Sequence, residues 1–222
     1  MTPTPRDGLM LYALLMCVPC LGRRAIRTLW PDGLTGEENM DRRLHQLCEA
    51  GLLVRHTGYA QEADAVELFY FRSPGMPSPD FGALAWELAK RWERVPHGKV
   101  VFYTAGEKAA RHYGRTVTNP LKSASALSHN INFGAVYLRL AALHPDLARC
   151  CVSEEVIAAA RGHGEKVIDA AIVDSTGTPA LGLEMAGASY AASNGERLRE
   201  IDADCLARGL PYEVWTVAEG RR

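Results

Sequence analysis

Apolar residues recur at helical spacing in three successive segments near the start of the chain. Residues 9–18 form an apolar run typical of a buried helix, and residues 23–30 predict a second helix that ends before the turn at 31–33. A third helix is predicted from residue 35. Its apolar residues fall on one side, at Met40, Leu44, Leu47 and Cys48.

Thr35 and Glu38 stand three residues apart at the expected start of the third helix. This spacing is typical of a capping box, in which the two side chains satisfy backbone N–H groups that a helix start leaves unpaired. After Gly51 come two β-prone runs, 52–54 and 66–71, separated by a polar loop. Three helices followed by a strand pair predict a winged helix-turn-helix over about the first 72 residues.

The polar side of the third helix carries side chains that hydrogen-bond to base edges in the major groove. We therefore expect this helix to read duplex DNA, with nearby arginines on the phosphates. Winged helices also dock proteins, and paired arginines on a helix are often only solvated surface. The expected base contacts are Asn39, Arg42, Arg43 and Gln46, and the expected phosphate contacts are Arg23, Arg24, Arg27 and Arg55.

Further along, residues 81–95 form an amphipathic helix with a basic side, which either extends the DNA contact or forms a dimer interface. Residues 99–103 predict a strand, and 123–143 predict a long, largely apolar helix. The segment 114–122 breaks the pattern. We therefore expect one domain over residues 1–118, the winged helix with a basic helical extension, and a second over 119–222.

The last third alternates strands and helices. Strands are predicted at 166–173, 181–185 and 212–217, with a helix at 194–208, and this order indicates a small α/β sheet. Three acids, Glu154, Asp169 and Glu184, fall near the ends of these strands. Carboxylates so placed can bind Mg²⁺ or Mn²⁺ and activate water against a phosphodiester, with Asp169 and Glu184 as the metal ligands.

The acid pattern lacks one expected feature. Ala186 stands two residues after Glu184, where a nuclease of the PD-(D/E)xK type has a lysine. Lys166, Arg197 or Arg199 would have to supply that cation from elsewhere. Alternatively, the three acids are solvent-exposed side chains at strand ends, or they form ion pairs with arginines.

Charge is uneven along a chain whose net charge is −1. Residues 73–144 hold nine Lys and Arg against four Asp and Glu, and residues 145–222 hold eight against thirteen.

The six cysteines mostly lie in apolar patterns, which favours reduced thiols. Cys17 and Cys20 have metal-ligand spacing but no accompanying pair. No run is apolar and long enough to span a bilayer, and the start is unlike a signal peptide, so we expect a cytoplasmic protein.

Several segments together resemble the replication-relaxation family of plasmids and other mobile elements. They are MDRRLHQLCEAGLLVR, YTAGEKAARHYG, LSHNINFGAVYLRL, SEEVIAA, KVIDAAIV, LGLEM and YEVWTV. The resemblance implies an α+β chain, a winged helix-turn-helix joined to a restriction-endonuclease-like α/β domain. It also matches Glu154, Asp169 and Glu184 to the family's acids, while Ala186 departs from its usual polar residue.

The expected function is therefore DNA binding in replication, transfer or transcription control of a mobile element. We expect double-stranded DNA and a second copy of the chain as partners, with other replication or transfer proteins as further candidates, and no membrane. The nuclease-like domain is expected to be catalytically degenerate and to need no cofactor. Two alternatives remain: a metal-dependent PD-(D/E)xK-type endonuclease, which would use Mg²⁺ or Mn²⁺ with Glu154, Asp169, Glu184 and Lys166, and a protein-docking adaptor.

Overall fold

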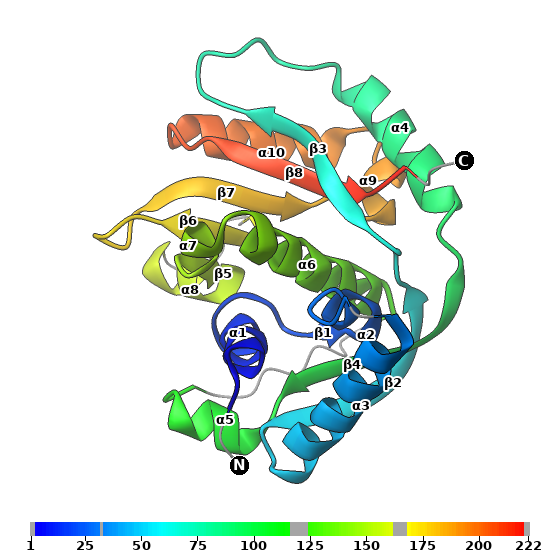
Figure 1. Cartoon of the computed structure of the whole chain (residues 1–222). Coiled ribbons are helices and arrows are strands. Elements are labelled where there is room, and N and C mark those ends of the chain that lie inside the picture. Colours follow the sequence, from blue (N-terminus) through cyan, green and yellow to red (C-terminus); the bar gives the residue numbers. More distant parts are fainter. Residues whose placement is uncertain (1–2, 32, 116–123, 162–167, 220–222) are drawn as a thin grey trace. The chain divides into compact units, whose positions relative to one another are not determined.

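The computed structural model is a mixed α+β chain with two sheets, as the sequence predicts (Figure 1). It describes all residues except 1–2, 32, 116–123, 162–167 and 220–222. The chain divides into two compact units, Met1–Asp64 with His97–Arg139, and Ala65–Pro96 with Leu140–Arg222. These bounds differ from the expected boundary at 118/119, because residues 65–96 pack with the C-terminal sheet.

Unit 1 contains three helices before its long strands, as expected. The first helix continues into a π-helical segment, η1, and a short strand separates it from the next two helices. The elements of unit 1 are α1 (Pro5–Tyr12), η1 (Ala13–Cys17), β1 (Leu21–Gly22), α2 (Arg23–Arg27), α3 (Gly33–Glu49), β2 (Leu53–Gln61), β4 (His97–Ala105), α5 (Glu107–His112) and residues 124–139 of α6 (Ala124–Leu143).

The sheet of unit 1 has the order β1-β4-β2, with both pairings antiparallel. Strand β2 pairs with β4 along its whole length, from Leu53 opposite Ala105 to Gln61 opposite His97. The predicted hairpin between residues 52–54 and 66–71 is therefore wrong in its pairing, although both runs are strands. Residues 66–72 form β3 (Val66–Arg72), which belongs to the other sheet.

Helix α3 buries the stripe that the sequence predicts. Met40, Leu44 and Leu47 are almost fully buried, while Cys48 is half-buried. The expected capping box is wrong, because the helix begins at Gly33 and Thr35 already lies inside it. Gly51, with a φ of 71°, turns the chain from α3 into β2, a conformation that favours glycine.

The elements of unit 2 form one five-stranded sheet with helices. Its strand order is β3-β8-β7-β6-β5, and β7 and β8 are the parallel pair. The remaining elements of unit 2 are α4 (Phe81–Glu93), α7 (Pro145–Ala148), β5 (Cys151–Ser153), α8 (Glu154–Arg161), β6 (Ala170–Val173), β7 (Pro179–Met185), α9 (Ala188–Ala192), α10 (Glu196–Ala207) and β8 (Tyr212–Val217).

A buried ion pair fixes β3 in this second sheet. Arg72, which is 4% exposed, donates from Nε to Oδ1 of Asp202 in α10 at 2.9 Å. The same oxygen accepts a hydrogen bond from the hydroxyl of Tyr212 in β8 at 2.8 Å. Buried charges are retained in proteins when they are paired in this way. Because β3 pairs with β8, it is not the wing strand beside residues 52–54 that the sequence predicts.

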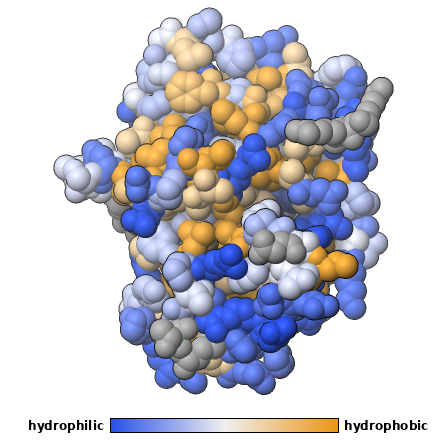
Figure 2. Space-filling view, viewed as in Figure 1, coloured by the Kyte–Doolittle hydropathy of each residue, from blue (hydrophilic) through white to orange (hydrophobic). Residues whose placement is uncertain are grey.

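Helix α4 is amphipathic as expected, but its apolar side packs into the core of unit 2 and not into the N-terminal domain to which the sequence analysis assigned it. Phe81 and Leu88 join a buried cluster with residues of α10 and β8, and the indole N–H of Trp92 donates to the carbonyl of Ala186 at 2.9 Å. Apolar residues remain exposed on β3 at Leu68 and Phe71. Figure 2 shows apolar side chains gathered over the strands of this sheet.

Candidate functional site

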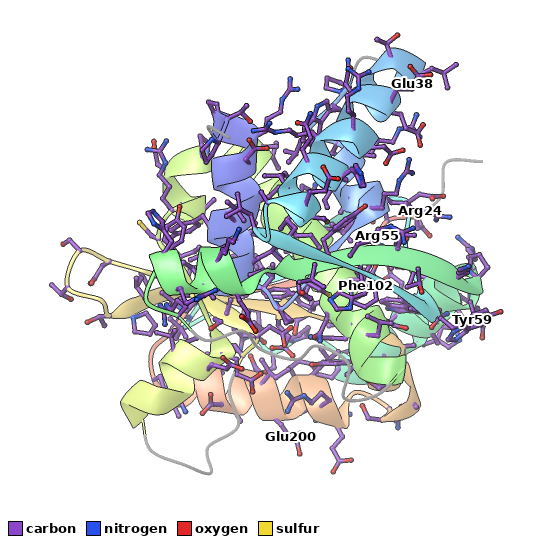
Figure 3. The ribbon with its side chains drawn as sticks, turned by 90° about the horizontal axis from the view of Figure 1, so that it is seen from below. Arg24, Glu38, Arg55, Tyr59, Phe102 and Glu200 are labelled. Atoms are coloured by element: carbon purple, nitrogen blue, oxygen red, sulfur yellow. The ribbon has the colours of Figure 1, made fainter. Side chains whose placement is uncertain are left out.

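Three of the four expected base-reading residues lie exposed on α3. Asn39, Arg42 and Gln46 are exposed and stand at i, i+3 and i+7, on one side of the helix. Glu38 and Glu49 are exposed on the same helix, and in Figure 3 Glu38 projects from α3 away from the strands. The exposed surface of α3 therefore mixes hydrogen-bonding, cationic and acidic groups.

Arg43, the fourth expected base-reading residue, has a structural partner. Its guanidinium donates to both carboxylate oxygens of Asp7 in α1, with Nη2 to Oδ2 at 2.5 Å, and Asp7 is fully buried. The same carboxylate forms a capping box with Thr4 at the start of α1. Burial raises the pKa of Asp7, but hydrogen bonds from Arg43 and Thr4 outweigh burial and leave the pKa lowered. Arg43 thus fastens α1 to α3.

The arginines of α2, expected on phosphates, are each paired with carboxylates of unit 1. Arg23 donates to Asp41 at 2.6 Å and to Glu37 at 2.8 Å, both on α3. These contacts raise the pKa of Arg23, with its hydrogen bond to Asp41 as the largest cause. Arg24 pairs with Asp64 at 2.8 Å and with Glu62 at 3.8 Å, and Arg27 pairs with Glu37 at 3.7 Å.

Strand β2 carries the fourth expected phosphate contact. Arg55 is exposed on β2, opposite Tyr103 of β4 in the register. Tyr59, four residues further along the same strand, is 63% exposed, and Figure 3 shows both side chains on this strand. Strands β2 and β4 contain no acidic residue, so this pair is locally basic.

The basic side of α4 is largely neutralised. Arg91 forms ion pairs with Glu67 and Glu87, and its guanidinium lies over the ring of Phe69. Lys90 lies over the ring of Trp86, with its Nζ at 3.2 Å from the ring centroid. Because Arg91 and Lys90 already have these partners, this helix is less suited to a strong phosphate contact than the sequence indicated.

The acids predicted in the C-terminal part do converge. Glu184 of β7 accepts a hydrogen bond at Oε2 from the backbone N–H of Asp169 at 3.2 Å. Asp169 in turn accepts at Oδ2 from the N–H of Met185 at 2.7 Å, and the N–H of Glu154 donates to the carbonyl of Asp169 at 2.9 Å. Lys166, the expected cationic partner, lies outside the described residues.

Two further side chains complete this cluster, and the sequence analysis missed one of them. The hydroxyl of Tyr190 in α9 donates to Oε1 of Glu184, and Nε of Arg197 in α10 donates to the Tyr190 hydroxyl at 3.3 Å. Arg197 also lies 3.9 Å from Oε1 of Glu184. Arg199, the other candidate, donates to the carbonyl of Asn194 instead. Tyr190 had no sequence signal, because its helix α9 is short and its side chain reads as apolar core.

The surroundings of Glu184 favour its neutral, protonated form. It is fully buried, and burial is the largest cause that raises its pKa well above 4.5, followed by the charges of Asp169 and Glu154. Both of its oxygens already accept hydrogen bonds. Among the described residues no three His, Cys, Asp or Glu side chains are grouped to hold a metal ion.

The six cysteines are free thiols, and Cys17 and Cys20 are both buried. Burial, with the nearby charge of Glu62, raises the pKa of the Cys20 thiol to about 12, which keeps it protonated.

Within the described residues, no helix combines the length and apolarity required to cross a membrane. Comparison of the chain with protein-family models, with curated proteins and with solved structures gave no match.

Proposed function

We propose that the protein binds double-stranded DNA through unit 1, which we interpret as a winged helix-turn-helix. The observation that carries this proposal is the sheet order β1-β4-β2, antiparallel throughout, reached through the element order α1, β1, α2, α3, β2, β4. In this interpretation β2 and β4 are the two wing strands. Residues 65–96, which include β3 and α4, are an insertion between them.

The exposed residues of α3 would then lie against the base edges. Asn39 and Gln46 carry amides that suit adenine, and Arg42 carries a guanidinium that suits guanine. Their side chains are exposed and share one side of the helix, which supports a reading role. Arg43 is removed from this set, because its guanidinium is held by the buried carboxylate of Asp7.

The strand arrangement of unit 2 supports the proposed resemblance to restriction-endonuclease-like domains. Strands β5, β6 and β7 follow one another antiparallel, helices come next in the chain, and β8 then pairs parallel to β7. Asp169 lies just before β6 and Glu184 near the end of β7, which is compatible with the positions that the resemblance gives to the family's acids. Because Glu184 is buried, hydrogen-bonded and favoured as the neutral acid, we propose a scaffold that does not cleave DNA.

The proposal as a whole is a DNA-binding protein of a plasmid or other mobile element, in line with the replication-relaxation resemblance. It would act in replication, transfer or transcription control. One winged helix covers a small DNA site, so we propose that a homodimer binds two half-sites. The two halves of a recovered site should then be related by two-fold symmetry.

Selection of duplexes from a random-sequence pool tests this proposal directly. The wild-type chain should enrich a defined sequence, and its affinity for that sequence should fall steeply with salt. Failure to retain any duplex at low salt would remove the DNA-binding proposal. A pull-down that recovered a protein partner, together with no DNA retention, would favour the docking alternative.

Cleavage is tested separately, with supercoiled plasmid in the presence of Mg²⁺ or Mn²⁺. The scaffold proposal predicts no nicking above that of an Asp169→Asn variant. Metal-dependent nicking by the wild-type chain that is lost in Asp169→Asn would establish the endonuclease alternative instead.

A further inference from the structure

A groove runs along unit 1 beside the C-terminal half of α3. It consists of two adjoining pockets of about 300 and 430 Å³ that share Cys48 and Arg55. The first is lined by residues of α2, α3, β2 and β4, and the second by residues of α3, β2 and α5. We call this surface the α3–β2–α5 groove. Its lining residues include Arg23, Asp41, His45, Cys48, Arg55, Tyr103, Glu107, Lys108 and Arg111.

The charged lining of the groove is predominantly cationic. Two carboxylates line it, and each has a cation beside it: Asp41 is bonded to Arg23, and Glu107 lies 3.9 Å from Arg111. Arg55 and Lys108 are exposed, and among the described residues no ion pair engages either one; the hydrogen-bond partner of Arg55 is the neutral hydroxyl of Tyr103. These two side chains are therefore the cations of the groove that remain available for an anionic ligand.

Tight packing holds the helix that carries Lys108 close to the start of β2. The N–H of Gly106, just before α5, donates to the carbonyl of Leu52 at 2.8 Å. A Cβ at position 106 would lie 2.3 Å from the carbonyl oxygen of Gly51, so only glycine allows this approach. The aliphatic stem of Lys108 lies over Gly51. Helix α5 is thus held against the turn between α3 and β2.

We propose that the α3–β2–α5 groove holds the phosphate backbone of the DNA whose bases face α3. The inference rests on the proposed function and makes it more specific, because it transfers the phosphate contacts from Arg23, Arg24 and Arg27 to Arg55 and Lys108. The arginines of α2 are already bonded to carboxylates, so phosphate would have to displace those partners. Arg55 and Lys108 meet phosphate without that cost.

The test measures affinity for a mixed-sequence duplex by fluorescence anisotropy over a range of salt concentrations. The groove variant carries Arg55→Gln and Lys108→Gln. The matched control carries Arg27→Gln and Arg139→Gln, which removes the same charge from exposed positions of unit 1. Thermal unfolding of all three proteins establishes that each is folded.

The groove variant should reduce the slope of log K against log salt by about 1.8, which corresponds to two phosphates at about 0.9 each. The control should keep the wild-type slope. Wild-type binding with an unchanged slope in the groove variant would overturn the inference and leave the proposed function standing. A wild-type chain that binds no duplex would overturn both. Inorganic phosphate that stabilises the wild type but not the groove variant, with equal duplex slopes, would identify a small-anion pocket and also overturn the inference.

Discussion

Asp169 and Glu184 hold each other in place through the backbone of β6 and β7. The N–H of Asp169 donates to Oε2 of Glu184 at 3.2 Å, and the carboxylate of Asp169 accepts from the N–H of Met185, the residue after Glu184. Tyr190 donates to the other oxygen of Glu184. The two acids therefore work as a hydrogen-bonded connection between neighbouring strands and α9.

Replacement of Glu184 separates this structural role from a metal-binding role. Glu184→Ala leaves the N–H of Asp169 and the hydroxyl of Tyr190 without their acceptor and opens a cavity, so we expect a loss of about 3 kcal/mol in the free energy of unfolding. Glu184→Gln keeps the acceptor oxygen, and we expect a loss under about 1 kcal/mol. Urea unfolding measures both. Equal losses in the two variants would contradict the account.

The same residue predicts a pH dependence of stability. Burial, with the charges of Asp169 and Glu154, raises the pKa of Glu184 above 4.5 in the folded chain. Its contribution to stability is therefore fully present below the unfolded pKa and is lost as pH rises toward the folded pKa, by about 1.4 kcal/mol per pH unit. Glu184→Gln cannot ionise, so its stability should improve relative to the wild type as pH rises. A constant difference across pH would contradict a raised pKa.

The pair of Asp7 and Arg43 predicts an effect on stability rather than on base recognition. Arg43→Ala leaves the fully buried carboxylate of Asp7 without its cation, so we expect a loss of about 3 kcal/mol. Arg42→Ala, on an exposed neighbouring position, serves as the control and should change stability by less than about 0.5 kcal/mol. Thermal or urea unfolding compares the two. An Arg43→Ala variant as stable as Arg42→Ala would show that the pair is not structural.

The lowered pKa of Asp7 sets the acid limit of this contribution. A carboxyl whose folded pKa is lowered stabilises the fold above its unfolded pKa of 3.8, and that stabilisation is lost as pH falls through the folded value. The difference in unfolding free energy between the wild type and Asp7→Asn should therefore shrink below about pH 4. A difference that stays constant in acid would mean that the charge of Asp7 contributes nothing.

Gly106 predicts a steric effect at the start of α5. Gly106→Ala forces a methyl group against the carbonyl of Gly51, so we expect a loss of about 2 kcal/mol. Gly98→Ala is the control on the same strand-helix segment, because a Cβ there meets nothing within 4 Å. Urea unfolding compares the two variants. If Gly106→Ala were as stable as Gly98→Ala, α5 would not be held as described.

The sequence predicted the individual elements well, because periodicity is local. The apolar stripe of α3 at Met40, Leu44 and Leu47 is buried, α4 packs on its predicted side, and the strands at 170–173, 179–185 and 212–217 are present. Which strands pair with each other was harder to predict from the sequence. Strand β2 pairs with β4 across an insertion of more than thirty residues, and nothing in the local pattern of Val66–Arg72 distinguishes a wing strand from an edge strand of another sheet.

The pattern of residues along the chain also did not predict which side chains pair with each other. Arg43 looked like a helix-surface cation, but its partner Asp7 is 36 positions away along the chain. The sequence predicted that Asp169 and Glu184 lie close together, because each falls near the end of one of two predicted neighbouring strands. Tyr190 and Arg197, which complete the cluster, come from helices whose placement on the sheet no spacing rule specifies.

The most direct test of the central claim uses the duplex selected by the wild-type chain. Asn39→Ala with Arg42→Ala removes two exposed groups of α3 and leaves Arg43 with its partners Asp7 and Gln46. We expect this double variant to stay folded, to lose its preference for the selected sequence, and to keep the weaker, salt-dependent binding to any duplex. An unchanged preference in the folded double variant would contradict the claim that α3 reads the bases.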